Sequence, residues 1–61
     1  RASLEADPRD AATYTNLGLL EMESGNLDAA VAYFTESLSL DPYGEVPRAN
    51  LSAALAALDR R

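Results

Sequence analysis

Two Asp-Pro steps, Asp7-Pro8 and Asp41-Pro42, lie 34 residues apart in this chain of 61 residues. A fixed period of about 20–50 residues is the signature of a stacked repeat array. Aligning the chain with itself at this offset pairs several identical residues: Ser3 with Ser37, Leu4 with Leu38, Asn16 with Asn50 and Leu17 with Leu51. The period therefore predicts repeated units, each of which needs neighbours to cover its apolar faces.

Apolar residues between the two steps recur every three or four positions, which predicts amphipathic helices rather than strands. We expect a first helix at about 11–24, with Asp10 as its N-cap. Gly25 stands where a helix end favours a left-handed residue, and Asn26 is expected to cap a second helix at about 27–40. The two helices are expected to form a hairpin.

The second Asp-Pro step ends the second helix, because proline disfavours the α conformation in the residue before it. A third helix is expected at about 45–60. Pro47 falls in the first turn of this helix, where its missing N–H costs little. Residues 1–6 suit the last turn of an earlier helix. The sequence therefore predicts an all-α chain, with a helical stub followed by three helices.

The hairpin resembles the tetratricopeptide repeat (TPR) family, in which an aromatic residue, Leu-Gly, Ala-x3-Phe and Pro recur at fixed spacing. The matching positions are those expected to pack the repeat: Tyr14, Leu17, Gly18, Ala30, Phe34 and Pro42. The resemblance implies a TPR-type helical hairpin solenoid fragment of about one and a half to two repeats. It divides a single domain, 1–61, into the end of a preceding repeat (1–8), a complete repeat (9–44) and a following or capping helix (45–61).

The matching residues have a clear packing role. Gly18 and Ala30 are small, so the two helices of the hairpin can approach closely where they cross. Leu17 and Phe34 are expected to fill the space between the helix layers. If Phe34 is fully buried, Phe34→Ala should cost about 3–5 kcal/mol, which is more stability than so small a domain can spare.

Four positions depart from the pattern of the family that the chain resembles. Glu21 stands where the family usually has Tyr, and Ser37 where it usually has Ala. Arg48 and Ser52 replace the aromatic residue and the glycine of the next repeat. Weakened consensus positions are typical of a terminal, solvent-facing helix, and also of ordinary repeat degeneracy.

Composition excludes several classes of function. The chain has no Cys, His or Lys, so it lacks the commonest metal ligands and acid–base groups, and no cofactor or metal is implied. Glu21 and Glu23, two positions apart on a helix, point to different faces, and we expect no enzyme activity. A net charge of −5 argues against binding nucleic acid or an anionic membrane surface. The sequence does not indicate a compartment.

The family resemblance implies a non-catalytic protein–protein interaction module that binds a peptide or helix in a groove lined by its first helices. The corresponding positions of this chain are Ala12, Thr15, Asn16, Leu19, Met22, Glu23, Val46, Ala49, Asn50 and Ala53. Asn16 and Asn50, one repeat apart, are expected to hydrogen-bond the backbone of an extended peptide. The alternative is that these asparagines are a feature of the family without a ligand, since two such helices make a short groove.

Some proteins of this family hold acidic peptide tails with a clamp of Lys and Arg beside such asparagines. Here the flanking groove positions are Ala12, Thr15, Val46 and Ala49, and no cation is available to pair with the carboxylates of such a tail. The sequence therefore predicts that this clamp is absent.

The third helix carries apolar residues on nearly every side, which predicts burial on more than one face. Leu51, Leu55 and Leu58 cannot all face the second helix. Either adjoining repeats cover the remaining face, or the chain forms a homo-oligomer through it. The alternative is that the alanines expose too little apolar area to matter.

Overall fold

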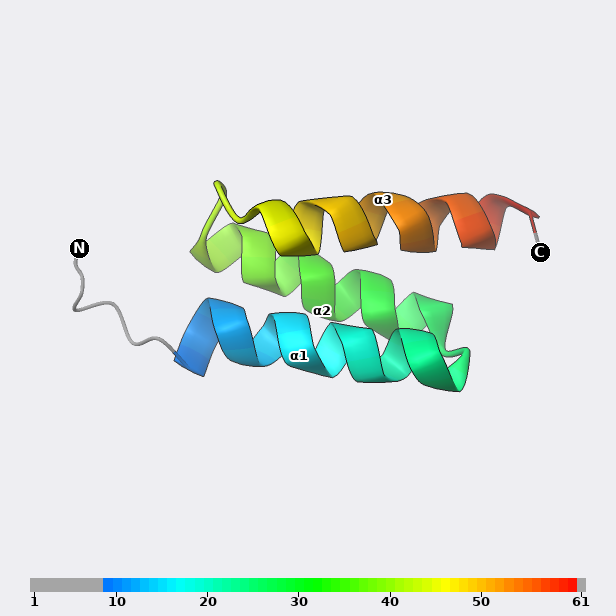
Figure 1. Cartoon of the computed structure of the whole chain (residues 1–61), viewed down its shortest axis with the longest axis horizontal. Helices are drawn as coiled ribbons and strands as arrows, with labels where there is room; N and C mark the ends of the chain where they lie inside the picture. The colour runs from blue at the N-terminus through cyan, green and yellow to red at the C-terminus, as the bar shows by residue number, and fades with distance from the viewer. Residues whose placement is uncertain (1–8, 61) are drawn as a thin grey trace.

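The computed structural model describes residues 9–60 as three helices joined by short turns. They are α1 (Arg9–Ser24), α2 (Leu27–Leu40) and α3 (Glu45–Arg60). Helix α2 lies between the other two and runs antiparallel to both (Figure 1). The predicted all-α helical-hairpin architecture is confirmed, while the predicted stub at 1–8 lies outside the described residues.

The turn between α1 and α2 is a Schellman motif. Gly25 has a φ of +85°, which confirms the predicted left-handed residue. The Gly25 N–H donates to the Met22 carbonyl at 3.0 Å, and the Asn26 N–H donates to the Glu21 carbonyl at 2.8 Å. These bonds satisfy two of the last four carbonyls of α1, and the chain direction reverses within two residues.

The predicted cap at Asp10 is wrong, and the predicted cap at Asn26 is right in position but makes no side-chain bond to its helix. Helix α1 begins at Arg9, so Asp10 lies in its first turn and is not the N-cap. A proline disfavours the α conformation only in the residue before it, so Pro8 does not prevent Arg9 from being helical. Asn26 does occupy the N-cap position of α2, but its side chain makes no capping bond. The Schellman turn brings its amide against α1 instead, where Nδ2 donates to Glu21 Oε1 at 2.9 Å.

The turn between α2 and α3 begins at Asp41. Its N–H donates to the Ser37 carbonyl at 2.9 Å, and its Oδ1 accepts from the Tyr43 N–H at 3.3 Å. The Gly44 N–H donates to the Asp41 carbonyl at 3.1 Å. Pro47 then lies in the first turn of α3, as the sequence predicts, and it is buried. The predicted bounds of α2 and α3 are confirmed.

The core is centred on α2. Ala30 and Phe34 of α2 and Ala54 of α3 are fully buried. Because α2 has a neighbour on each side, it supplies most of the buried side chains, whereas α1 and α3 each keep an exposed outer face (Figure 1). Within residues 9–60, no helix has both the length and the apolar character needed to cross a membrane.

Candidate functional site

The spacing of α1 and α2 is set where Gly18 meets Phe34. A Cβ atom added to Gly18 would lie 2.6 Å from Cε1 of the Phe34 ring and 2.8 Å from Cδ1. Such distances are far below van der Waals contact, so the glycine leaves the space that the ring occupies. This contact fixes how close α1 lies to α2, and through α2 it places α1 relative to α3.

An aromatic pair extends this interface towards the start of α1. The rings of Tyr14 and Tyr33 are stacked, with centroids 6.1 Å apart and an interplanar angle of 28°. Both side chains are half-buried. Stacked aromatic pairs at this separation contribute beyond their buried area, so the contact of Tyr14 with Tyr33 helps to hold α1 against α2.

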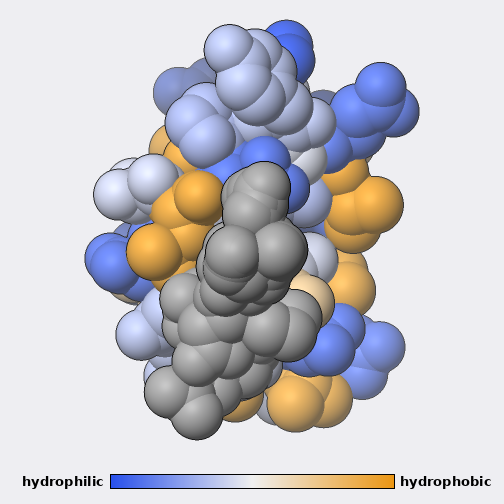
Figure 2. All heavy atoms as spheres, turned by 90° about the vertical axis from the view of Figure 1, so that its left-hand side faces the viewer, coloured by the Kyte–Doolittle hydropathy of each residue, from blue (hydrophilic) through white to orange (hydrophobic). Residues whose placement is uncertain are grey.

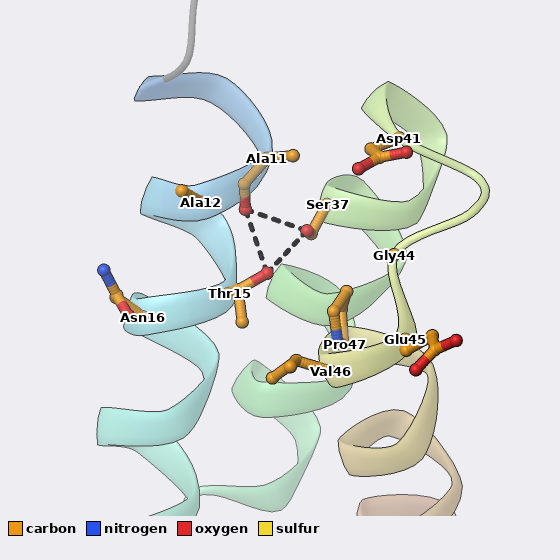
Figure 3. A pocket seen from close by; sticks show the side chains of 10 residues that line it. All are labelled: Ala11, Ala12, Thr15, Asn16, Ser37, Asp41, Gly44, Glu45, Val46 and Pro47. Carbon is orange, nitrogen blue, oxygen red and sulfur yellow. Dashed lines mark hydrogen bonds between the residues drawn. The ribbon is translucent and has the colours of Figure 1, made fainter.

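A buried hydroxyl group closes the interface near the turn between α2 and α3. Ser37 is fully buried, and its Oγ donates to the Ala11 carbonyl at 2.8 Å. Thr15 Oγ1 donates to the same carbonyl at 2.9 Å and lies 2.7 Å from Ser37 Oγ. The three oxygens form a triangle (Figure 3). Two hydroxyl protons are shared among its three edges, and the buried Ser37 hydroxyl is satisfied.

A hollow of about 330 Å³ lies beside this triangle. It is bounded by α1, the end of α2 and the first turn of α3, as Figure 3 shows. We call it the α1–α3 groove, and its lining residues are Ala11, Ala12, Thr15, Asn16, Ser37, Asp41, Gly44, Glu45, Val46 and Pro47. The groove is open to solvent and exists because the turn at Asp41 brings the start of α3 beside the start of α1.

The groove is lined by both apolar and polar side chains. Ala12 and Val46 are exposed, and Val46 keeps 57% of its surface accessible. Asn16 points away from α2 with an exposed side-chain amide that bonds to none of the described residues (Figure 3). Asp41 and Glu45 are the charged lining residues, and both are acidic. The groove therefore offers apolar contact, an exposed amide and negative charge.

Apolar surface continues outside the groove at this end of the molecule. Leu40 and Tyr43, on either side of Asp41, are 45% and 88% exposed. Figure 2 views this end and shows hydrophobic residues on both sides of it, interspersed with hydrophilic ones. Both apolar side chains are therefore exposed close in sequence to Asp41, which lines the groove.

The predicted groove positions are only partly brought together. Ala12, Thr15, Asn16 and Val46 line the groove. The rest lie outside it: Leu19 and Met22, half-buried; Glu23, Ala49 and Ala53, exposed; and Asn50, half-buried. The Asn50 amide donates to the Val46 carbonyl at 2.9 Å, so one of its donors is already used within α3.

Sequence reasoning missed the residues that close the groove at the turn. Asp41, Gly44 and Glu45 line it, and Ser37 supports it from α2. The 34-residue offset contained the signal, because it pairs Glu45 with Ala11 and so places the two helix starts side by side. Ser37 departs from the family pattern, but nothing in the sequence spacing connects it to Thr15.

The three leucines of α3 divide between its faces. Leu51 and Leu58 are half-buried, while Leu55 is 49% exposed. Val46 and the Ala49, Ser52 and Ala53 positions are exposed as well. The prediction that the leucines cannot all face α2 is confirmed, and it is Leu55 that faces outwards.

Comparison with known protein families finds a match. The tetratricopeptide repeat family model matches residues 11–43, which is more than half of the chain. This range contains the whole α1–α2 hairpin from Ala11 onwards. No curated protein and no solved structure matches the chain.

Proposed function

Because the chain belongs to the tetratricopeptide repeat family, whose members generally bind protein partners and are typically non-catalytic, we propose that its α1–α3 groove binds a peptide segment of a partner protein. The family match and the three helices support a division into one complete repeat, 9–44, followed by α3 as the start of the next unit. Residues 1–8 would then belong to a preceding unit.

The groove itself is the observation that carries this proposal. Its hollow of about 330 Å³ gathers residues from α1 and α3 that are between 29 and 36 positions apart in the sequence. Such convergence of apolar walls with a few polar groups is what ligand sites share. The free Asn16 amide can donate to one backbone carbonyl of an extended peptide and accept from one N–H.

A peptide selection followed by NMR tests this function. Peptides selected against the whole chain from a random 12-residue display library would be titrated into the labelled chain. We expect amide shifts to concentrate at Ala12, Asn16 and Val46. Asn16→Ala should weaken binding about tenfold, because one to two hydrogen bonds to the peptide backbone are lost.

Thr35→Ala is the matched control, since Thr35 is an exposed polar residue on α2 and does not line the groove. This variant should bind with unchanged affinity. Shifts confined to the exposed side of α2, or equal affinity for Asn16→Ala and the parent chain, would count against groove binding.

A second function is favoured by the exposure of α3. Leu55 is 49% exposed and the outer side of α3 has no neighbour among residues 9–60. We propose that α3 packs against a further helix, from an adjoining repeat, a second copy or a partner. Light scattering over a concentration series distinguishes the second copy, because the mass would double. A strictly monomeric mass at high concentration would exclude self-association through Leu51, Leu55 and Leu58.

A further inference from the structure

The charged residues that line the α1–α3 groove have one sign. Asp41 and Glu45 are exposed acidic residues of the lining, and no arginine among the described residues lines it. Arg48, one turn further along α3, is exposed and lines a different hollow. The Glu45 carboxylate makes no ion pair or hydrogen bond with the described part of the chain. The negative charge of the groove is therefore not neutralised by a described side chain.

The turn between α2 and α3 holds both acidic residues on one side of the groove. Asp41 Oδ1 accepts from the Tyr43 N–H at 3.3 Å, and the Gly44 N–H donates to the Asp41 carbonyl at 3.1 Å. A Cβ atom added to Gly44 would lie 3.0 Å from Cγ of Pro47, so the turn lies close against this buried residue. Asp41 and Glu45 therefore stand across the groove from α1, as Figure 3 shows.

Helix dipoles do not cancel this charge. Helices α1 and α3 begin beside the groove, and α2 ends there (Figure 3). A helix N-terminus carries about half a positive charge, and a C-terminus about half a negative one. The three ends together contribute about half a positive charge, which is smaller than the two full negative charges of Asp41 and Glu45. The groove therefore favours a cation.

Apolar surface lies beside the carboxylates. Ala12 and Val46 line the groove and are exposed. Tyr43, two positions from each acidic residue, is 88% exposed. Arginine and lysine side chains match this combination, because each has an apolar stem that ends in a positive charge. A carboxylate or phosphate in the same place would face like charges.

No segment of these 61 residues has the chemistry of such an occupant. Of the segments longer than two residues outside the helices, residues 1–8 contain one arginine and two acidic residues, and residues 41–44 contain one acidic residue. Both segments are negatively charged, and the whole chain has a net charge of −5. Charge complementarity therefore favours a basic segment of another protein over a segment of a second copy.

We propose that the α1–α3 groove selects basic peptides: an extended segment of a partner protein places an arginine or lysine side chain against Asp41 and Glu45. This inference rests on the proposed peptide binding by the groove, and it names the chemistry of the ligand. The peptide backbone lies along α1, where the Asn16 amide is exposed, and a neighbour of the basic residue covers Val46.

Peptide selection with the whole chain tests the charge preference. A random 12-residue display library is selected in parallel against the parent chain and against the double variant Asp41→Asn, Glu45→Gln. Asparagine keeps a side-chain oxygen for the Tyr43 N–H, so the turn is retained. We expect arginine or lysine at one fixed position of the peptides that the parent chain enriches, and no such position for the double variant.

NMR titration then measures the contribution of the basic residue. A selected peptide is compared with a copy in which that residue is glutamine. The basic residue should strengthen binding to the parent chain about fivefold, the upper range for an exposed ion pair. This advantage should be lost in the double variant, and it should shrink as salt is raised, because salt screens exposed charges.

Glu23→Gln is the matched control. Glu23 is an exposed acidic residue of α1 that does not line the groove, so its replacement removes a charge from the chain but not from the groove. The fivefold advantage of the basic residue should persist in this variant. Circular dichroism checks that each variant keeps its helices.

The remaining outcomes separate this inference from peptide binding itself. If the peptides shift the amides of Ala12, Asn16 and Val46 but the glutamine copy binds equally well, the charge preference is overturned while groove binding stands. An advantage that survives in the double variant, or is lost in Glu23→Gln, would overturn the preference as well. If no peptide shifts these amides in a folded chain, groove binding and the charge preference are both overturned.

Discussion

Replacing Gly18 by alanine tests whether the Phe34 ring sets the distance between α1 and α2. In an ordinary helix interior, Gly→Ala stabilises by about 1 kcal/mol through helix propensity. Here the new Cβ would lie 2.6–2.9 Å from three atoms of a fully buried ring. Overpacking of this kind costs about 1–3 kcal/mol. We therefore expect a net loss of about 1 kcal/mol, opposite in sign to the propensity effect.

Urea unfolding followed by far-ultraviolet circular dichroism measures this difference. A domain of this size has only about 3–5 kcal/mol of net stability, so titrations should start at low temperature with an osmolyte to secure the folded baseline. Ser52→Ala is the matched control, because Ser52 stands one repeat later in α3 and is exposed. It should be neutral or stabilise by about 0.5 kcal/mol.

The Phe34→Leu background completes the test. Leucine lacks the ring atoms that approach Gly18, so Gly18→Ala should become neutral or stabilising there. The coupling between the two substitutions should be about 1–3 kcal/mol, as for contacting residues in a double-mutant cycle. A stabilising Gly18→Ala in the parent chain, with no coupling to Phe34, would refute the argument that the ring occupies the glycine's space.

Two further substitutions test the oxygen triangle at Ser37 and the turn at Gly25. Ser37→Ala should destabilise by about 1 kcal/mol relative to Ser39→Ala, an exposed serine in the same helix, because a buried hydrogen bond to the Ala11 carbonyl is lost; equal urea midpoints for the two would show that the bond contributes nothing. Gly25→Ala should cost about 1–2 kcal/mol although no atom lies within 4 Å of the added Cβ, since the penalty comes from the positive φ alone. Gly25→Asn should cost less in the same melting experiment, and an equal cost would contradict a purely conformational origin.

The helices and their order follow from local signals, which is why most of the fold could be predicted. Gly25, Pro42 and Pro47 restrict the backbone directly, so they mark turns and helix starts whatever the rest of the molecule does. The predicted side-chain cap at Asn26 does not form, because its partner depends on the rest of the fold. An asparagine amide has several partners within reach, and only the folded turn decides that Glu21 receives it.

The groove was less predictable because it depends on contacts between distant residues. The spacing of the family motif places Ala12, Thr15 and Asn16 on the side of α1 that lines the groove. It could not show that Asp41 and Glu45 close the groove, since their position depends on how the second turn bends. Nor could spacing show that Asn50 donates to the carbonyl of its own helix, which leaves Asn16 as the more available amide.

The oxygen triangle of Ala11, Thr15 and Ser37 has a consequence for local opening of the molecule. The first turn of one helix and the last turn of its neighbour normally fray independently, with little free energy between open and closed. Here one carbonyl accepts hydroxyl bonds from both elements, so neither turn can open without breaking a bond to the other. The first turn of α1 and the last turn of α2 therefore form one cooperative unit, and the amide hydrogens of both turns should exchange with solvent in a single event.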